Sequence, residues 1–215
     1  MLSYEQARKY YDRFGEKQDH QFYENSPIEK LIEFGDFDKA NSIFELGIGT
    51  GRFAKNLLDN HLSDICKYVG IDISSTMVDL SKNRLEKYTD RVKIVQSDGI
   101  PQINEENESF DRFVSTYVFD LLNNDDITAL LSEAYRILKD GGYLCVVSLG
   151  QGITITSRIV EKVWSLIFKV KSSLVGGCRP LALQNYIEKT KWKIIYKNVI
   201  VSFGVPSEII VCKKL

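Results

Sequence analysis

The stretch that decides the fold is Glu45-Leu46-Gly47-Ile48-Gly49-Thr50-Gly51. It begins at the end of an apolar run, Ser42–Leu46, that predicts a strand, and it leads directly into a predicted helix over Gly51–Leu58. Glycines at such a bend allow positive φ and let a ligand approach the backbone closely. We therefore interpret residues 45–51, the glycine-rich loop, as a ligand-binding loop rather than as a turn that binds nothing.

The spacing of these glycines separates the loop from a dinucleotide-binding one. A dinucleotide site usually has the pattern G-x-G-x-x-G, with the pyrophosphate at the N-terminus of the helix. This sequence has G-x-G-x-G, and Arg52 stands where the third dinucleotide glycine would be. The spacing therefore argues against an NAD-dependent oxidoreductase.

An acidic residue ends the second predicted strand, Lys67–Asp72. A carboxylate at this position can accept hydrogen bonds from both ribose hydroxyls of a nucleoside, and it repels a 2′-phosphate. The alternative is that Asp72 caps the next helix. Ser74 is better placed for that cap, which favours the ligand role for Asp72.

The third predicted strand, Val92–Gln96, is followed by Ser97-Asp98-Gly99. Because the carboxyl ends of parallel strands share one edge of a sheet, we expect Asp98 near the same ligand site. It would accept a hydrogen bond from an adenine amino group. The alternative is an Asx-turn before Gly99.

From Ser42 onward, short apolar runs alternate with amphipathic helical stretches, which predicts one α/β domain with a mostly parallel sheet and helices on both faces. Trp192–Ser202 and Glu208–Lys213 are also strand-like. The five residues between them leave no room for a crossover helix, so we expect an antiparallel hairpin at the sheet edge. The other expected elements are strands over Phe110–Ser115 and Tyr143–Leu149 and a helix over Asp125–Lys139 that stops at Gly141.

Residues 42–150 resemble, in order and spacing, the class I methyltransferases that use S-adenosylmethionine (SAM). The likeness rests on the glycine-rich loop, Asp72, Ser97-Asp98-Gly99, Ser109-Phe110-Asp111-Arg112-Phe113-Val114-Ser115-Thr116 and Arg136-Ile137-Leu138-Lys139-Asp140-Gly141-Gly142. It is most similar to the branch of ubiquinone/menaquinone-type and other small-molecule methyltransferases. The resemblance implies a Rossmann-like three-layer sandwich, a seven-stranded sheet whose last strand is antiparallel, and S-adenosylhomocysteine as the product.

The resemblance also implies where SAM would bind. The implied contacts are Glu45, Gly47, Gly49, Gly51, Asp72, Ile73, Asp98, Gly99 and Ser115. It further implies that residues 1–35 fold over the cofactor as a lid, with Tyr11 and Phe14 as the favoured aromatic contacts. For each of these two aromatics, packing is an equally good explanation.

The sequence departs from that branch after the fourth strand, where many relatives carry a paired-histidine or polar-aromatic motif. This chain has Tyr117-Val118-Phe119-Asp120-Leu121-Leu122 instead. Apolar surroundings raise the pKa of a carboxyl group, so Asp120 is a candidate general base, an acceptor-orienting group, or alternatively a solvent-facing loop residue. We also expect Tyr117, Trp164 and Arg179 to contact the acceptor, although a structural turn explains Arg179 equally well.

Residues 150–191 lie outside the α/β pattern and are expected to cover the substrate. Within them, Ile155–Val170 predicts an amphipathic helix with an apolar and a basic side. We favour a helix that roofs an apolar substrate pocket. Its alternatives are a helix that rests on a membrane surface and takes a lipid, and a core-facing helix with a solvated basic face.

Composition limits the class of partner. Lys plus Arg is 28 and Asp plus Glu is 29, giving a net charge of -1, which argues against a large nucleic-acid footprint. No apolar run is long enough to cross a bilayer, the N-terminus is polar, and the four scattered cysteines signal neither a disulfide frame nor a metal site. We therefore expect a cytoplasmic methyltransferase acting on a small-molecule or lipid-like acceptor, with a non-catalytic SAM-binding module as the alternative.

Overall fold

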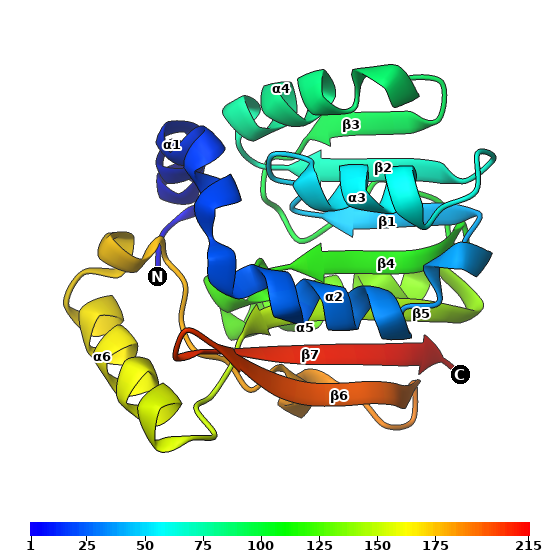
Figure 1. Ribbon diagram of the computed structural model, residues 1–215. Helices are drawn as coiled ribbons and strands as arrows, with labels where there is room; N and C mark the ends of the chain where they lie inside the picture. Colours follow the sequence, from blue (N-terminus) through cyan, green and yellow to red (C-terminus); the bar gives the residue numbers. More distant parts are fainter.

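A computed structural model describes residues 1–215 and contains one seven-stranded sheet (Figure 1). The strands are β1 (Ser42–Leu46), β2 (Lys67–Asp72), β3 (Val92–Gln96), β4 (Phe110–Thr116), β5 (Leu138–Leu149), β6 (Trp192–Ser202) and β7 (Val205–Lys214). Their order in the sheet is β3-β2-β1-β4-β5-β7-β6. Strands β1 to β5 pair in parallel, whereas β7 is antiparallel to both β5 and β6. The predicted fold class is confirmed, including the C-terminal hairpin.

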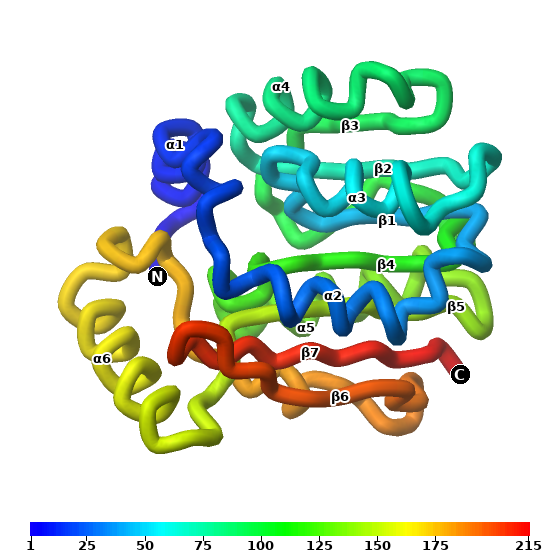
Figure 2. Tube along the Cα trace, viewed as in Figure 1, coloured from blue at the N-terminus to red at the C-terminus, as the bar shows by residue number.

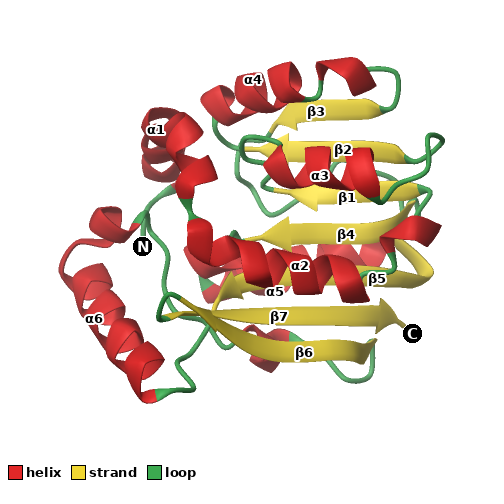
Figure 3. Cartoon of the chain, viewed as in Figure 1, coloured by secondary structure: helices red, strands yellow, loops and turns green.

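Helices cover both faces of this sheet. They are α1 (Tyr4–Phe14), α2 (Asn25–Phe34), α3 (Arg52–Asn60), α4 (Ser75–Arg84), α5 (Asn124–Ile137) and α6 (Ile155–Lys171). Short 3₁₀ turns occupy Gly15–His20, Phe22–Glu24, Phe37–Lys39, Glu86–Tyr88, Phe119–Leu121, Ser172–Val175 and Leu183–Tyr186. Figure 3 shows α2 and α3 in front of the sheet and α5 behind it, which gives three layers. None of the helices combines the length and the apolarity that crossing a membrane requires.

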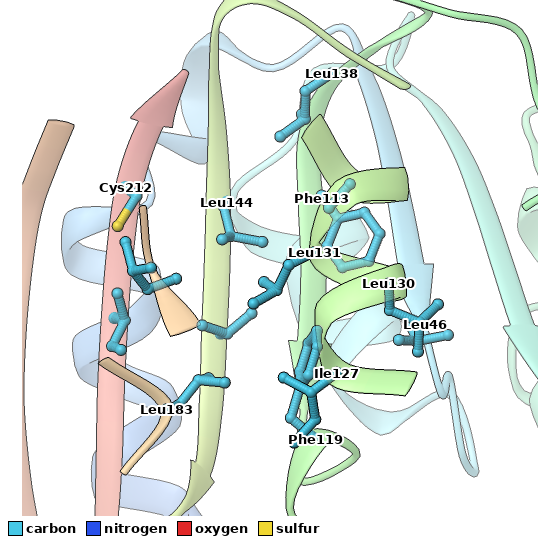
Figure 4. Close-up of a cluster of buried hydrophobic side chains, with 14 of the residues drawn as sticks. Leu46, Phe113, Phe119, Ile127, Leu130, Leu131, Leu138, Leu144, Leu183 and Cys212 are labelled. Carbon is cyan, nitrogen blue, oxygen red and sulfur yellow. The ribbon is translucent and has the colours of Figure 1, made fainter. Parts of the chain in front are cut away.

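Two apolar cores form because successive strand residues point to opposite faces of the sheet. Ile43 packs in the core beneath α2 and α3, while its neighbour Phe44 packs in the core beneath α5. On the α5 side, Phe44 stacks on Phe113 with ring centroids 5.5 Å apart. Figure 4 shows Phe113 beside Leu130 and Leu131 of α5. Apolar side chains on both faces of each central strand thus hold the sheet between the two helical layers.

The boundary between α5 and β5 differs from the prediction. The helix was expected over Asp125–Lys139 with a stop at Gly141, but it ends at Ile137 and β5 begins at once with Leu138. Leu138 pairs with Phe110, and the register then shifts before the pairing of β4 and β5 resumes. Gly141, at φ 73°, lies in this irregularity and does not stop the helix.

The C-terminal hairpin has a tighter turn than expected. Strand β7 begins at Val205 rather than Glu208, so the turn consists only of Phe203 and Gly204. Their φ values of 51° and 81° suit the two-residue turns that match the twist of paired strands. Pro206 and Ser207, expected in the loop, are part of the ladder with β6.

Residues 1–35 and 150–191, which we expect to cover the ligand site, do not lie beyond the strand ends along their whole length. In Figure 2 the tube of α1 and that of α6 lie beyond the carboxyl ends of β1 to β5, whereas α2 lies along the sheet. Phe34 of α2 stacks on Tyr196 of β6 with ring centroids 3.8 Å apart. Within residues 150–191, Leu181, Leu183 and Ile187 are buried in the α5-side core. Parts of both segments therefore pack against the sheet and its core instead of lying beyond the strand ends.

We expect Phe113→Ala to lower the free energy of unfolding by about 3–5 kcal/mol, because it removes a fully buried ring and leaves a cavity. The matched control is Phe203→Ala at the hairpin turn, where the ring is 86% exposed. That change should stay within about 0.5 kcal/mol. Urea unfolding followed by circular dichroism measures both. Equal losses would contradict the assignment of Phe113 to the core.

Candidate functional site

The glycine-rich loop turns the chain from β1 into α3. Gly47, Gly49 and Gly51 have φ values of 76°, 54° and 77°, which side chains with a Cβ rarely adopt. A Cβ on Gly47 would lie 2.3 Å from Cγ2 of Val118, and a Cβ on Gly51 would lie 3.1 Å from Cα of Ser81. A Cβ on Gly49 would have nothing within 4 Å. Packing therefore explains Gly47 and Gly51, whereas Gly49 leaves open space beside the backbone.

Asp72 fixes this loop from the end of β2. Its Oδ2 accepts a hydrogen bond from the Gly49 amide at 2.9 Å, and its Oδ1 accepts one from the Ser74 amide at 2.9 Å. Ser74 is the N-cap of α4, as predicted: its hydroxyl accepts from the Met77 amide and donates to Asp12 at 2.6 Å. Burial raises the pKa of Asp72 to about 6. Each carboxylate oxygen has more than one lone pair, so Asp72 can still accept from a ligand.

Glu45, at the start of the loop, is buried with one oxygen unpaired. Its Oε2 accepts a hydrogen bond from the Tyr68 hydroxyl at 2.7 Å, while Oε1 has no partner. Burial raises the pKa of Glu45 to about 8. A buried polar atom without a partner in the protein calls for a partner of another kind, and Glu45 lines a cavity.

That cavity, of about 480 Å³, lies between the glycine-rich loop, the carboxyl ends of the strands and the N-terminal residues. It is called the first cavity below. The predicted site residues that line it are Glu45, Gly47, Gly49, Asp72, Ile73, Gly99, Tyr11 and Tyr117. Tyr117 has φ 56°, an uncommon conformation for a bulky residue, and its hydroxyl lies 2.8 Å from that of Ser207. The structure thus gathers residues from the three strand ends and the N-terminus around one space.

Four of the predicted cofactor contacts lie elsewhere, and one of them is Gly51, which packs against Ser81. The side chain of Asp98 is exposed and accepts from the Ile100 amide at 2.9 Å, which is the Asx-turn considered as its alternative. The buried Ser115 hydroxyl donates to the Leu46 carbonyl at 3.1 Å. Phe14 lines a second cavity rather than the first. None of the four belongs to the wall of the first cavity.

A polar network that sequence reasoning missed anchors the N-terminal residues over this cavity. Asp19 accepts from the Thr50 hydroxyl at 2.6 Å and pairs with Arg84 at 2.5 Å. Arg52 donates to the Asp19 carbonyl at 2.9 Å and pairs with Glu24 at 3.3 Å. Glu24 is buried and lines the first cavity, and burial raises its pKa to about 8. In the sequence, the only sign of this network is that Asp19 and Glu24 occur within the aromatic-rich N-terminal segment.

A second cavity, of about 580 Å³, adjoins the first under α6. Both cavities are lined by Tyr11, Gln21, Tyr23 and Cys178. The other residues of its mainly apolar wall include Tyr10, Phe14, Phe22, Trp164, Ile167, Leu174, Val175, Phe203 and Val205. Trp164, expected to contact the acceptor, is held there by a hydrogen bond from its indole N–H to the Cys178 carbonyl at 3.0 Å.

Asp120 is buried and lines neither cavity. It is 1% exposed, so the solvent-facing alternative is wrong. Neither of its carboxyl oxygens has a hydrogen-bond partner, and burial raises its pKa to about 6, in the predicted direction. Cys178, which lines both cavities, acts in the opposite direction and lowers the pKa of Asp120.

Arg179 is part of the scaffold around Asp120 in this structure. Its amide donates to the Asp120 carbonyl at 3.0 Å. Its guanidinium donates to the Leu122 carbonyl at 3.0 Å and to the Asn124 side chain at 3.2 Å. It lines neither cavity, which matches the structural-turn alternative.

The family match and the two relatives described here all concern methyltransferases. Residues 43–142 match a family described as "Methyltransferase domain". The chain is 33% identical over 128 residues to phosphoethanolamine N-methyltransferase 2 of Caenorhabditis elegans, covering 57% of this chain and 27% of that protein. It is 26% identical over 154 residues to a demethylmenaquinone methyltransferase of Leptospira interrogans, covering 69% of this chain and 59% of that protein. The chain therefore spans less than two thirds of the length of either relative.

Solved structures share the fold. One is the N-methyltransferase NodS from Bradyrhizobium japonicum WM9 in complex with S-adenosyl-L-homocysteine, with a TM-score of 0.68 and 14% identity. The match covers 89% of this chain and 87% of that one. Another is a SAM-dependent methyltransferase from Methanosarcina mazei, with a TM-score of 0.67 and 16% identity over 86% of this chain and 97% of that one. At sequence identities of 14% and 16%, the likeness to these two structures shows a shared fold alone.

The buried proton of Glu45 makes the stability of the chain depend on pH. The folded chain keeps this proton up to about pH 8, whereas the ordinary pKa is 4.5. The stabilisation is therefore complete below about pH 4.5 and is lost as the pH rises towards about 8. We expect the free energy of unfolding from urea titrations to fall over that range, by at most about 1.4 kcal/mol per pH unit for this group.

The variant Glu45→Gln keeps a neutral side chain at every pH, so its stability should fall less steeply. The matched control is Glu86→Gln, at an exposed glutamate. If both variants keep the slope of the unmodified chain, the pH dependence comes from groups other than Glu45.

Proposed function

We infer that the chain is a class I SAM-dependent methyltransferase, as the family match over residues 43–142 and the similar proteins support, and we propose that it transfers a methyl group from SAM to a small-molecule acceptor. The observation that carries the proposal is the pairing of Asp72 with the open backbone at Gly49. This pairing presents a fixed carboxylate beside free space at the carboxyl edge of the sheet, where α/β folds bind ligands. Because the chain spans less than two thirds of the length of either relative, the activity of the whole protein is itself part of this proposal.

The residues of the first cavity fit SAM. Asp72 is fixed with capacity to accept from ribose hydroxyls, and the absence of a Cβ at Gly49 leaves room for a ligand beside the backbone. Glu45 offers an unpaired buried oxygen to a donor, such as the ammonium of the methionine part. Ile73 supplies apolar contact in the same wall. When bound, SAM supplies an electrophilic methyl group on a sulfonium.

We place the acceptor at the junction of the two cavities. The apolar walls of the second cavity favour an acceptor with an apolar part, held beneath Trp164 and Phe14. Its reacting end would then pass Tyr11 and Tyr23, which line both cavities. These aromatic faces would also stabilise a nearby cation. Holding donor and acceptor in line is a major source of rate in such a transfer, and the proposed placement would provide it.

Two buried carboxyl groups, those of Asp120 and Glu24, are candidates for the general base. The prediction that Asp120 is the base has support from its unpaired oxygens and a pKa of about 6. Asp120 is not in the wall of either cavity, however, and a base must reach the proton that it takes. Glu24 lines the first cavity with a pKa of about 8. We propose Glu24 as the proton acceptor, with Asp120 acting through Cys178 and Tyr11 as a positioning residue.

Replacing Asp72 tests the cofactor site. We expect Asp72→Ala to weaken SAM binding by about 1.5–3 kcal/mol, because ligand hydroxyls lose a charged acceptor. Asp98→Ala is the matched control, since this carboxylate is exposed and outside the cavity wall. Isothermal calorimetry with SAM measures both, and unfolding curves check that each variant is folded. Equal affinities for the unmodified chain and Asp72→Ala would contradict the ribose assignment.

Replacing the two buried carboxyls distinguishes them. The acceptor is first identified by SAM-dependent methylation of a metabolite extract. We then expect Glu24→Gln to reduce kcat by about 10²–10⁴-fold with SAM affinity preserved, as loss of a general base does. Asp120→Asn should act mainly on the KM for the acceptor. The reverse pattern would identify Asp120 as the base. If the unmodified chain methylates no acceptor in the extract, a SAM-binding module without turnover is favoured instead.

A further inference from the structure

The outward face of α6 is apolar, which is unusual for a surface helix. Surface helices normally direct apolar residues inward and polar residues to water. In α6 the residues Ile155, Ile159, Val163, Leu166 and Val170 are each 52–79% exposed. At 3.6 residues per turn they form a stripe about 80° wide along the whole helix. We call these five residues the α6 stripe.

The opposite face of the same helix holds it on the protein. Trp164 and Ile167 line the second cavity, and Cγ2 of Val160 lies 3.3 Å from the place that a Cβ on Gly204 would take in the hairpin turn. These inner-face side chains are half-buried, and the helix thus contacts the rest of the protein without using the α6 stripe. A contiguous exposed apolar surface of this kind marks an interaction site.

Charge identifies the kind of partner. Arg158, Lys162 and Lys169 follow one flank of the stripe, all are exposed, and none forms an ion pair. The only acid of the helix, Glu161, accepts a hydrogen bond from the Gly152 amide at 2.8 Å. Unpaired cations beside an apolar stripe, in a chain with a net charge of -1, complement a surface that is apolar inside and anionic outside.

From these observations we propose that α6 docks the protein on an anionic lipid surface, with the α6 stripe in the acyl region and the cationic flank among the headgroups. The helix lies beyond the carboxyl ends of the parallel strands, on the side of the candidate site (Figure 1). Phe203 and Leu174, on the rim of the second cavity, are 86% and 66% exposed on this side. Docking would therefore bring the mouth of the second cavity to the lipid surface.

A second copy of the chain fits this face less well. An isologous dimer presents the same patch on both partners, so the cationic flank would need acids within the patch to pair with. The outward face of α6 carries none, because Glu161 lies on the other side of the helix and already bonds Gly152. A lipid surface supplies the missing negative charge.

Co-sedimentation of the full chain with vesicles tests the proposal without SAM or an acceptor, so its outcome is independent of the proposed function. We expect binding to vesicles of equal parts phosphatidylglycerol and phosphatidylcholine, weaker binding to phosphatidylcholine alone, and a decrease as NaCl is added. Leu166→Asp should weaken binding at least about tenfold. The combined change Lys162→Glu and Lys169→Glu should remove the preference for anionic vesicles.

Matched controls lie at the opposite end of the sheet, just before and at the start of β2. Ile65→Asp replaces an aliphatic residue that is 77% exposed, and Lys67→Glu replaces an exposed lysine. Both should bind vesicles like the unmodified chain. Failure of the unmodified chain to bind either vesicle overturns the proposal, as does binding that the α6 variants leave unchanged. A dimer in analytical ultracentrifugation that Leu166→Asp dissociates would assign the face to a second copy instead.

Discussion

The two hydrogen bonds accepted by Asp72 are the constraint on which the site depends. One carboxylate joins the amide of Gly49 to the amide of Ser74, and so fixes the loop after β1 against the loop after β2. Ser74 in turn caps α4 and donates to Asp12 in α1. The two strand ends at the ligand edge and the N-terminal segment beside them are therefore joined through one half-buried acid, so neutralising Asp72 would loosen all three.

The fold was predictable where its signals are local. The apolar runs of β1 to β4 are bounded by polar or glycine residues, and their limits match the expected ones closely. The start of β5 was not predictable, because Leu138 continues an apolar helical period and becomes a strand only by pairing with Phe110. Pro206 suggested a loop, yet it pairs with Val201 near the start of β7. It precedes Ser207, where the pairing of β7 with β5 begins, so its missing N–H removes no bond of that ladder.

The candidate site was predictable in its backbone and less so in its side chains. Gly49 and Asp72 follow from a spacing tied to a strand end. Ser115 was misplaced because strand side chains alternate, so that its neighbour Thr116 lines the cavity in its place. Glu24 and Asp19 acquire their roles only through partners 28 to 65 residues away in the chain, a distance over which local patterns carry no information.

The ion pair between Asp19 and Arg84 has a consequence for how long a bound molecule would stay in the first cavity. Together with the bond from Thr50, it holds the N-terminal residues beside that cavity. A molecule bound there would exchange more freely when these contacts open, so the ion pair would contribute to its residence time. Both side chains are about one quarter exposed, which makes the ion pair accessible to counterions. Ionic strength should thus shorten residence in the cavity while leaving the buried contacts beneath it unchanged.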